Sequence, residues 1–148
     1  MSDHDEPPPT TTVLISNRQA AAIDEQTLTR LAANTLAGEG LLGVELSVSF
    51  VEETEIEDLH VRYMDEPGPT DVLSFPLDDV DEGGTRLLGD VVIAPAVAAR
   101  NNPADPQAEL RLLLVHGILH LLGYDHEEDV EKTEMWARQE RYSGVRAP

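Results

Sequence analysis

The stretch from residue 110 to residue 126 constrains this chain more than any other part of the sequence. A largely apolar run at residues 110–115 predicts a long, buried helix that continues through His116 and His120. Because these histidines stand four residues apart, about one helical turn, both imidazoles project from the same face. Gly123 follows, and glycine adopts φ > 0 without steric cost, which makes it the usual residue just past a helix end. We therefore expect the chain to turn there and to bring His126 back toward the first two histidines.

His116, His120 and His126 form a set of candidate metal ligands. Three neutral nitrogen ligands with one open position are typical of a catalytic zinc site rather than a structural one. The alternative is that they are ordinary histidines on a helix and its exit, since a pair at four-residue spacing is common by itself. The glycine turn and the third histidine favour the metal site. The sequence predicts one Zn²⁺ per chain, although three imidazoles accept several divalent ions.

The spacing of these residues matches a long zinc-protease motif, H-E-x-x-H-x-x-G-x-x-H, with one decisive difference. Those proteases need a glutamate directly after the first histidine as general base. This chain has Gly117 at that position, which has no side chain to move a proton. The ligand set fits, and the peptidase chemistry does not.

Four blocks of sequence resemble the YbeY family, bacterial metal-dependent endoribonucleases of ribosomal RNA maturation. The blocks are HGILHLLGYDH at residues 116–126, PTDVLSFP at 69–76, GDVVIA at 89–94, and Glu109-Leu110 before the histidine helix. The similarity runs from about residue 13 to about residue 140, nearly the whole chain.

This resemblance implies a zinc-dependent endoribonuclease specific for single strands, acting in 16S rRNA 3′-end maturation and ribosome quality control. The implied partners are a single-stranded ribosomal RNA precursor and the small ribosomal subunit, with no DNA and no membrane. The three histidines would hold the metal, and Asp71, Ser74 and Phe75 would line a groove beside it. On physical grounds alone, a strand Asp and Ser serve equally well as structural hydrogen-bonding residues.

One position departs from the family pattern. The family usually has an arginine thought important for cleavage where this chain has Met64, and Arg62 lies two residues earlier. Two residues correspond to about 200° around a helix, so Arg62 substitutes for it only if the backbone turns there. A catalytic arginine is therefore in doubt, whereas the metal ligands are unaffected.

Asp125 is a further candidate site residue, with two competing roles. It would orient a ligand imidazole from outside the metal's own ligand set, or it would be a turn residue after Gly123. The sequence also leaves the cleavage route open. Zinc-activated water would attack the phosphodiester itself, or it would deprotonate the ribose 2′-hydroxyl.

The charge of the chain argues against an RNA substrate. Acidic residues number 29 and basic residues 10, which gives a formal net charge of −19. Nucleic-acid binders usually show a basic footprint, because Lys and Arg supply most of the affinity for phosphate. Lys132 is the only lysine. Arginine grips phosphate with two donors, so a few in one cleft would suffice locally. The candidates are Arg62, Arg86, Arg100 and Arg111.

Composition also limits the compartment and the ligand chemistry. The chain has no cysteine, which excludes disulfides and thiolate metal sites. It contains no apolar run long enough to span a bilayer, and its acidic N-terminus does not resemble a signal peptide. The simplest interpretation is a soluble, cytoplasmic protein.

The order of patterns predicts an α+β single domain at residues 13–142. A disordered, acidic and proline-rich tail is expected at 1–12 and a C-terminal tail at 143–148. We expect strands at 13–15, 44–51, 70–77 and 88–94, and helices at 24–37, 54–63, 95–100, from 106 to Gly123, and at 127–141. Together these elements predict a mixed sheet of about four strands packed against helices, with the metal helix at the centre.

Several residues have a predicted role in these elements. Asp105 is expected to cap the metal helix. Thr54 is expected to begin the second helix in a capping box with Glu57. Glu109 is expected to interact with the helix dipole. The expected core contacts of the last helix are Val130, Met135 and Trp136.

Two other functions compete with the nuclease. The first is a zinc hydrolase of another substrate class, although Gly117 argues against a peptidase. The second is a non-catalytic, ribosome-associated metal-binding factor in which the metal only holds the fold; Met64 and the net charge favour it. Substitution of His120 by alanine separates these cases in part. Loss of a structural metal unfolds the domain, whereas loss of a catalytic metal leaves it folded.

Overall fold

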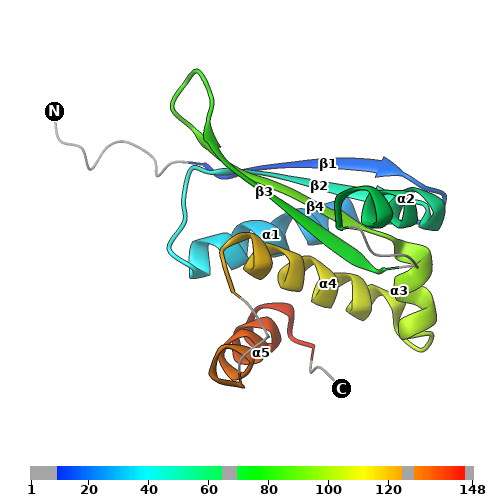
Figure 1. Ribbon diagram of the computed structural model, residues 1–148. Helices are drawn as coiled ribbons and strands as arrows, with labels where there is room; N and C mark the ends of the chain where they lie inside the picture. Colours follow the sequence, from blue (N-terminus) through cyan, green and yellow to red (C-terminus); the bar gives the residue numbers. More distant parts are fainter. Residues whose placement is uncertain (1–9, 65–69, 125–128, 146–148) are drawn as a thin grey trace, which may run out of the picture.

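The computed structural model describes residues 10–64, 70–124 and 129–145. Most of the predicted N-terminal tail, together with Asp125 and His126, lies outside these residues. The elements in chain order are β1 (Thr12–Arg18), α1 (Glu25–Gly38), β2 (Glu45–Val51), α2 (Glu53–Met64), β3 (Val72–Val80), β4 (Arg86–Ile93), α3 (Pro95–Asn101), α4 (Pro106–Leu121) and α5 (Asp129–Ser143) (Figure 1). Each predicted strand and helix has its counterpart. β1 begins inside the predicted tail, and α5 ends one residue past the predicted domain end.

The strands form one mixed sheet with the order β1-β2-β4-β3. β1 pairs in parallel with β2, and β2 pairs in parallel with β4. β3 and β4 form an antiparallel hairpin whose turn projects beyond the sheet in Figure 1. Helices α1 and α4 cover one face, α2 covers part of the other, and α5 packs against α4 on the side away from the sheet. The predicted α+β domain with a mixed sheet is confirmed.

Alternation along the strands divides the core into two layers. Leu46, Val48 and Phe50 of β2 are buried and belong to the cluster under α1 and α4. On the opposite face, Val92 of β4 packs in a smaller cluster with Ile56 of α2. Because successive strand side chains point to opposite faces, one strand serves both layers. Burial of each such aliphatic side chain contributes about 1.5–3 kcal/mol.

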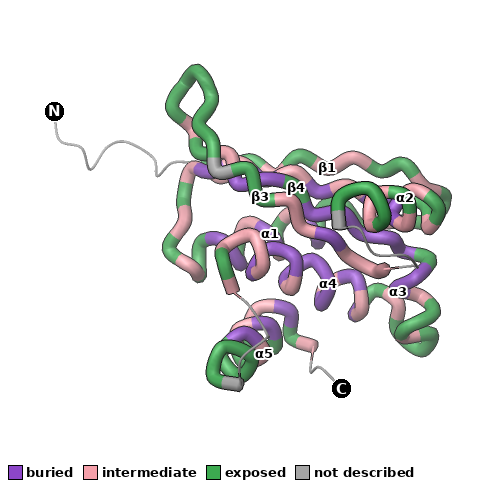
Figure 2. Tube along the Cα trace, viewed as in Figure 1, coloured by how far each residue is buried: buried purple, intermediate pink, exposed green. Residues whose placement is uncertain are grey.

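Helix α4 is the central element, as predicted. The Asp105 side chain accepts a hydrogen bond from the Ala108 N–H at 3.1 Å, which caps the first turn. At the other end, Gly123 has φ +99°. Its N–H donates to the His120 carbonyl at 3.0 Å, and the Tyr124 N–H donates to the Leu119 carbonyl at 3.0 Å. This pair of bonds is a Schellman motif, which ends the helix with a left-handed glycine. Most of α4 between these caps is buried (Figure 2).

Two local predictions are wrong. Helix α2 begins at Glu53, and the Ile56 N–H donates to the Glu52 carbonyl at 3.2 Å. Glu52 therefore holds the cap position, and Thr54 lies inside the first turn. Val130 is 79% exposed, whereas Met135 is fully buried. Val130 and Met135 are five residues apart, which corresponds to one full helical turn plus about 140°. Their side chains therefore project from different faces of α5.

No helix in the described segments is long and apolar enough to cross a membrane.

Candidate metal centre

His116 and His120 lie together on one face of α4. Their ring centroids are 4.6 Å apart, and the ring planes are inclined by 73°. Both side chains are partly buried. Within the described segments, no three side chains of metal-ligating type gather at one point, and His126, the predicted third ligand, lies outside them. Imidazole nitrogens are typical zinc ligands, and the two described histidines of this face lie close to each other.

The ring of His116 is held from the side of α5. Its Nδ1 lies 2.7 Å from Oε1 of Gln139. Gln139 is only 3% exposed. Trp136, one turn earlier on α5, lies with its ring centroid 5.9 Å from that of His116. Gln139 cannot be recognised as a site residue from the sequence, because nothing in the local pattern shows which face of α5 meets α4.

Gly117 allows α4 to pack directly on the sheet. A Cβ atom at this position would lie 2.6 Å from Val91 Cγ1 and 3.3 Å from Ser74 Oγ. The Ser74 hydroxyl donates to the Gly117 carbonyl at 2.8 Å. Position 117 therefore faces β3 and β4, about 100° around the helix from His116. This orientation agrees with the absence of the protease glutamate at that position.

A groove of about 290 Å³ lies beside His116. It is lined by residues of β3, α4, α5 and the segment before β3, namely Asp71, Val72, Glu109, Leu112, Leu113, His116, Trp136 and Gln139. Of the three residues predicted to line a groove beside the metal, Asp71 lines this one. Its carboxylate accepts a hydrogen bond from Asn101 Nδ2 at 3.1 Å.

Glu109 shares this groove and lies in the first turn of α4, as the dipole prediction requires. Burial raises the pKa of the Glu109 carboxyl, and the negative charge of Asp71 acts in the same direction. A hydrogen bond from Asn101 opposes the shift. The groove therefore has an acidic end, formed by Glu109 of α4 and by Asp71 in the segment before β3.

The other predicted groove residues have structural partners. Ser74 bonds the backbone of α4, as described above. Phe75 follows it on the strand and points to the opposite face, where its ring lies 5.5 Å from that of Tyr63, edge to face. The alternation of β3 separates these neighbours, so Phe75 does not line the groove beside His116.

The candidate arginines lie on four different elements. Arg62 on α2 pairs with Asp58 one turn away, at 2.9 Å. Arg100 on α3 donates to both oxygens of Glu53, at 2.5 and 2.8 Å. Arg86 is on β4 and Arg111 on α4. Arg62 and Arg100 are thus held by carboxylates.

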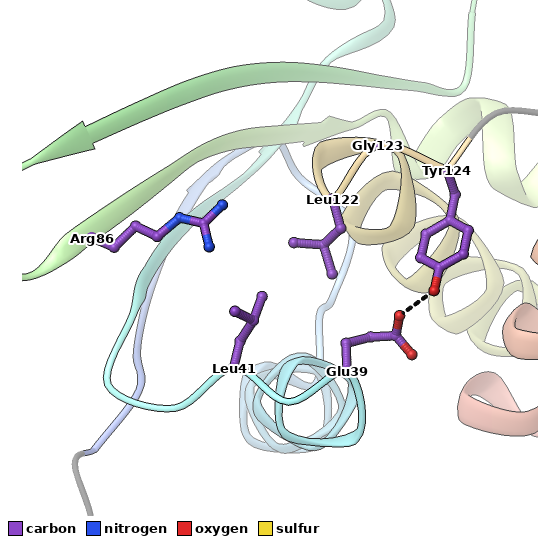
Figure 3. A pocket seen from close by; sticks show the side chains of 6 residues that line it. All are labelled: Glu39, Leu41, Arg86, Leu122, Gly123 and Tyr124. Carbon is purple, nitrogen blue, oxygen red and sulfur yellow. Dashed lines mark hydrogen bonds between the residues drawn. The ribbon is translucent and has the colours of Figure 1, made fainter.

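A second hollow, of about 380 Å³, lies at the C-terminal end of α4 (Figure 3). Its lining comes from the ends of α1 and α4 and from β4, and consists of Glu39, Leu41, Arg86, Leu122, Gly123 and Tyr124. Figure 3 shows the Tyr124 hydroxyl directed at Glu39, with the Arg86 side chain on the opposite side of the hollow.

Glu39 is the centre of a buried polar cluster next to this hollow. Its side chain is 6% exposed and accepts hydrogen bonds from the Tyr124 hydroxyl at 2.6 Å, the Tyr142 hydroxyl at 2.5 Å and the Arg138 guanidinium at 2.8 Å. Burial opposes ionisation, but these hydrogen bonds and the charge of Arg138 outweigh it and hold the pKa of Glu39 below its usual value.

The same cluster fixes the C-terminal end of α4. Burial and the bond to Glu39 raise the pKa of Tyr124 to about 12. Tyr124 is thus anchored to α1, and through Glu39 to Arg138 and Tyr142 of α5, just before residues 125–128. No spacing in the sequence connects these four residues, because they meet only after α1, α4 and α5 have packed.

The fold and this site define a single-domain α+β protein with a candidate metal centre on its central helix. The model of the family described as endoribonuclease YbeY matches residues 14–144. Several curated relatives that are named endoribonuclease YbeY are similar to this chain, and one from Streptomyces coelicolor is 44% identical over 84% of this chain and 83% of its own. One from Thermobifida fusca is 48% identical over 84% of this chain and 86% of its own. One from Frankia alni is 50% identical over 80% of this chain and 73% of its own.

A solved structure supports the same relationship. The solution structure of TM1509 from Thermotoga maritima is 30% identical in sequence, has a TM-score of 0.58, and is matched over 89% of this chain and 87% of that chain. The chain belongs to the endoribonuclease YbeY family. The resemblance carried by the sequence blocks is confirmed, as is the enzyme class at the level of the family.

Proposed function

We propose that this protein is a zinc-dependent endoribonuclease that cuts single-stranded ribosomal RNA precursors. It would act in the cytoplasm with the small ribosomal subunit, in 16S rRNA 3′-end maturation and ribosome quality control. The pair of imidazoles on α4, with ring centroids 4.6 Å apart, carries the proposal, because it lies within residues 14–144 that the family model matches. The names of the relatives supply the substrate class.

His116, His120 and His126 are the residues that would hold the zinc ion. When bound, zinc supplies a Lewis acid and lowers the pKa of its water to about 7. The Nδ1 of His116 lies against the carbonyl oxygen of Gln139, so the metal would be bound through Nε2. Asp125 remains a candidate for orienting one of these imidazoles.

The groove beside His116 would receive the RNA strand. Single strands splay their bases and bend into grooves that a duplex cannot enter. Asp71 and Glu109 repel phosphates and accept hydrogen bonds from ribose hydroxyls and base amines. The sugar or base edges of the strand, rather than its phosphates, would therefore face this acidic end.

The test is cleavage of a single-stranded fragment from the 3′ region of precursor 16S rRNA by purified protein, with zinc content quantified. The His116→Ala variant removes one ligand. The His60→Ala variant removes an imidazole from α2 and is the matched control. We expect wild type and the control to carry one zinc and cut RNA, and His116→Ala to do neither. If wild type binds zinc but cuts no RNA across a range of salt, the nuclease proposal fails.

One observation favours a non-catalytic, ribosome-associated factor as the second candidate. The net charge is −19, and Arg62 and Arg100 are held by carboxylates rather than directed at a substrate. The His120→Ala variant distinguishes the two. A catalytic site loses activity while the thermal unfolding of the metal-free protein stays cooperative; a purely structural site loses the folded state together with the metal.

A further inference from the structure

The structure assigns Gln139 as a positioning residue for His116: it holds the imidazole as the Nδ1–H tautomer, so that Nε2 faces the metal, and it does so without adding charge. This inference rests on the proposed function for the identity of the ligand. It concerns a contact between α4 and α5, and it can be tested in the metal-free protein.

The contact between His116 and Gln139 determines which ring nitrogen carries the proton. The carbonyl oxygen of an amide only accepts hydrogen bonds, so a contact of 2.7 Å between Oε1 and Nδ1 requires the proton on Nδ1. In a neutral imidazole the lone pair then resides on Nε2. Metal-binding histidines commonly donate their other ring N–H to such an acceptor, which fixes both the tautomer and the orientation of the ring.

Neighbouring residues hold the contact between Gln139 and His116 in place. Gln139 is buried to 3% exposure, so water does not compete freely for its amide. Trp136, on the same face of α5, flanks the His116 ring at 5.9 Å and limits its rotation. The Ser143 hydroxyl donates to the Gln139 backbone carbonyl at 2.6 Å, so this bond holds the helix backbone and not the amide side chain.

The choice of an amide has a chemical consequence. A carboxylate at this position would also accept from Nδ1, but it would raise the basicity of the ligand and lower the net positive charge at the metal. In a chain with 29 acidic residues, the acceptor next to this candidate ligand is neutral. A neutral acceptor would fix the ring without adding negative charge beside the ion, which would then be the stronger Lewis acid.

The first experiment is long-range ¹H–¹⁵N correlation of the histidine rings in metal-free protein at about pH 8, where imidazoles are neutral. We expect His116 to be the Nδ1–H tautomer in wild type and in Gln139→Glu, which keeps the acceptor. We expect it to shift toward the Nε2–H form in Gln139→Leu. Ser143→Ala loosens α5 without touching the ring, and it should keep the wild-type pattern.

The second measurement is zinc affinity by competition with a chelator. Gln139→Leu should bind zinc about 10–100-fold more weakly than wild type, while Ser143→Ala stays within a few-fold. An Nε2–H tautomer in metal-free wild type overturns the inference, and so does a Gln139→Leu variant with unchanged tautomer and affinity. The wild-type spectrum decides the matter even if Gln139→Leu does not fold. If the tautomer is as expected but the protein binds no zinc, the proposed function fails and the assignment of Gln139 to the ring stands.

Discussion

Gly117 shows how the absence of one side chain sets the distance between a helix and a sheet. Val91 Cγ1 lies only 2.6 Å from the place where a Cβ at position 117 would be, and Val91 is fully buried. Helix α4 can approach β3 and β4 only because position 117 contributes no side-chain volume. The Ser74 hydroxyl uses this proximity to reach the Gly117 carbonyl.

Gly117→Ala is expected to destabilise the protein by about 2 kcal/mol, because overpacking a well-filled core typically costs about 1–3 kcal/mol. The usual gain of alanine over glycine inside a helix, about 1 kcal/mol, offsets only part of the clash. Urea unfolding measures the difference. The double variant with Val91→Ala supplies space for the new methyl group, so it should be more stable than the sum of the two single changes predicts. Strict additivity would contradict the proposed contact.

Glu39 makes a second residue-scale prediction. Glu39→Gln should lower stability at pH 7 by about 2 kcal/mol, because it weakens hydrogen bonds from two tyrosines and an arginine in a buried cluster. The pKa of Glu39 is depressed in the folded state. The contribution of Glu39 to the stability of the fold is therefore complete above the ordinary carboxyl pKa of 4.5. It is lost as the pH falls through the lower pKa that Glu39 has in the folded state.

Unfolding in urea from pH 7 down to pH 3 tests this sign. The stability difference between wild type and Glu39→Gln should shrink below about pH 4.5. Glu134→Gln is the control, since Glu134 also pairs with Arg138 but is 53% exposed, and such surface pairs contribute little. A difference that stays constant or grows toward pH 3 would show that the charge of Glu39 does not stabilise the cluster.

At the scale of elements, local patterns predicted more of the fold than of the site. The cap at Asp105 and the Schellman turn at Gly123 depend on residues within one turn of each other, so the sequence shows them directly. The alternation in β2 likewise identifies the strand and its buried face. Thr54 was misplaced because adjacent acidic residues at 52 and 53 also suit a helix start, and only the backbone bond to Glu52 decides between them.

The candidate site was predicted only as far as its local spacing. His116 and His120 lie on one face because a helix places them there, and the four-residue spacing states this directly. Gln139 and Glu39 were missed because their partners lie 23 and 85 residues away. Such contacts depend on how α5 and α1 pack against α4, which no helical period encodes.

The turn after α4 yields a prediction at this scale. Gly123 and Gly144 both follow helices and have φ of +99° and +70°, and among the described residues no atom crowds the place that an added Cβ would take. Alanine at either glycine should therefore cost about 1–2 kcal/mol of stability, the penalty of a left-handed conformation. Only Gly123→Ala should also weaken zinc binding, because residue 126 follows this turn. Equal zinc affinity in both variants would argue that the turn does not place a ligand.

For the whole molecule, the distribution of charge matters more than its sum. Several arginines are held by acidic partners, in the pairs Arg18–Glu55, Arg62–Asp58, Arg100–Glu53 and Arg138–Glu39. These guanidinium groups stabilise contacts between elements or along a helix, so fewer cations are available for phosphate. The net charge of −19 acts on an approaching polyanion through long-range repulsion, which salt screens.

The salt dependence of RNA cleavage should therefore be shallow. For single strands, each phosphate neutralised contributes about −0.7 to the slope of log K against log salt. Two such contacts would give a slope of about −1.4, and we expect the slope for kcat/KM between 50 and 500 mM KCl to be no steeper than this, because screening of the repulsion partly offsets it. A slope near −3 or steeper would show that a basic surface forms in the complex. Charge-neutral substrate analogues provide the control, because their slope should be close to zero.

Synthesis from the N-terminus to the C-terminus gives the contact between Gln139 and His116 a temporal order. Both described histidines of α4 are synthesised before Gln139 is added, so a partly made chain has imidazoles without the amide that orients one of them. Tyr142, which completes the cluster at Glu39, is added later still. Helix α5 thus supplies the last residues that line the groove beside His116. The site reaches its final geometry only after α5 has been synthesised and has packed against α4.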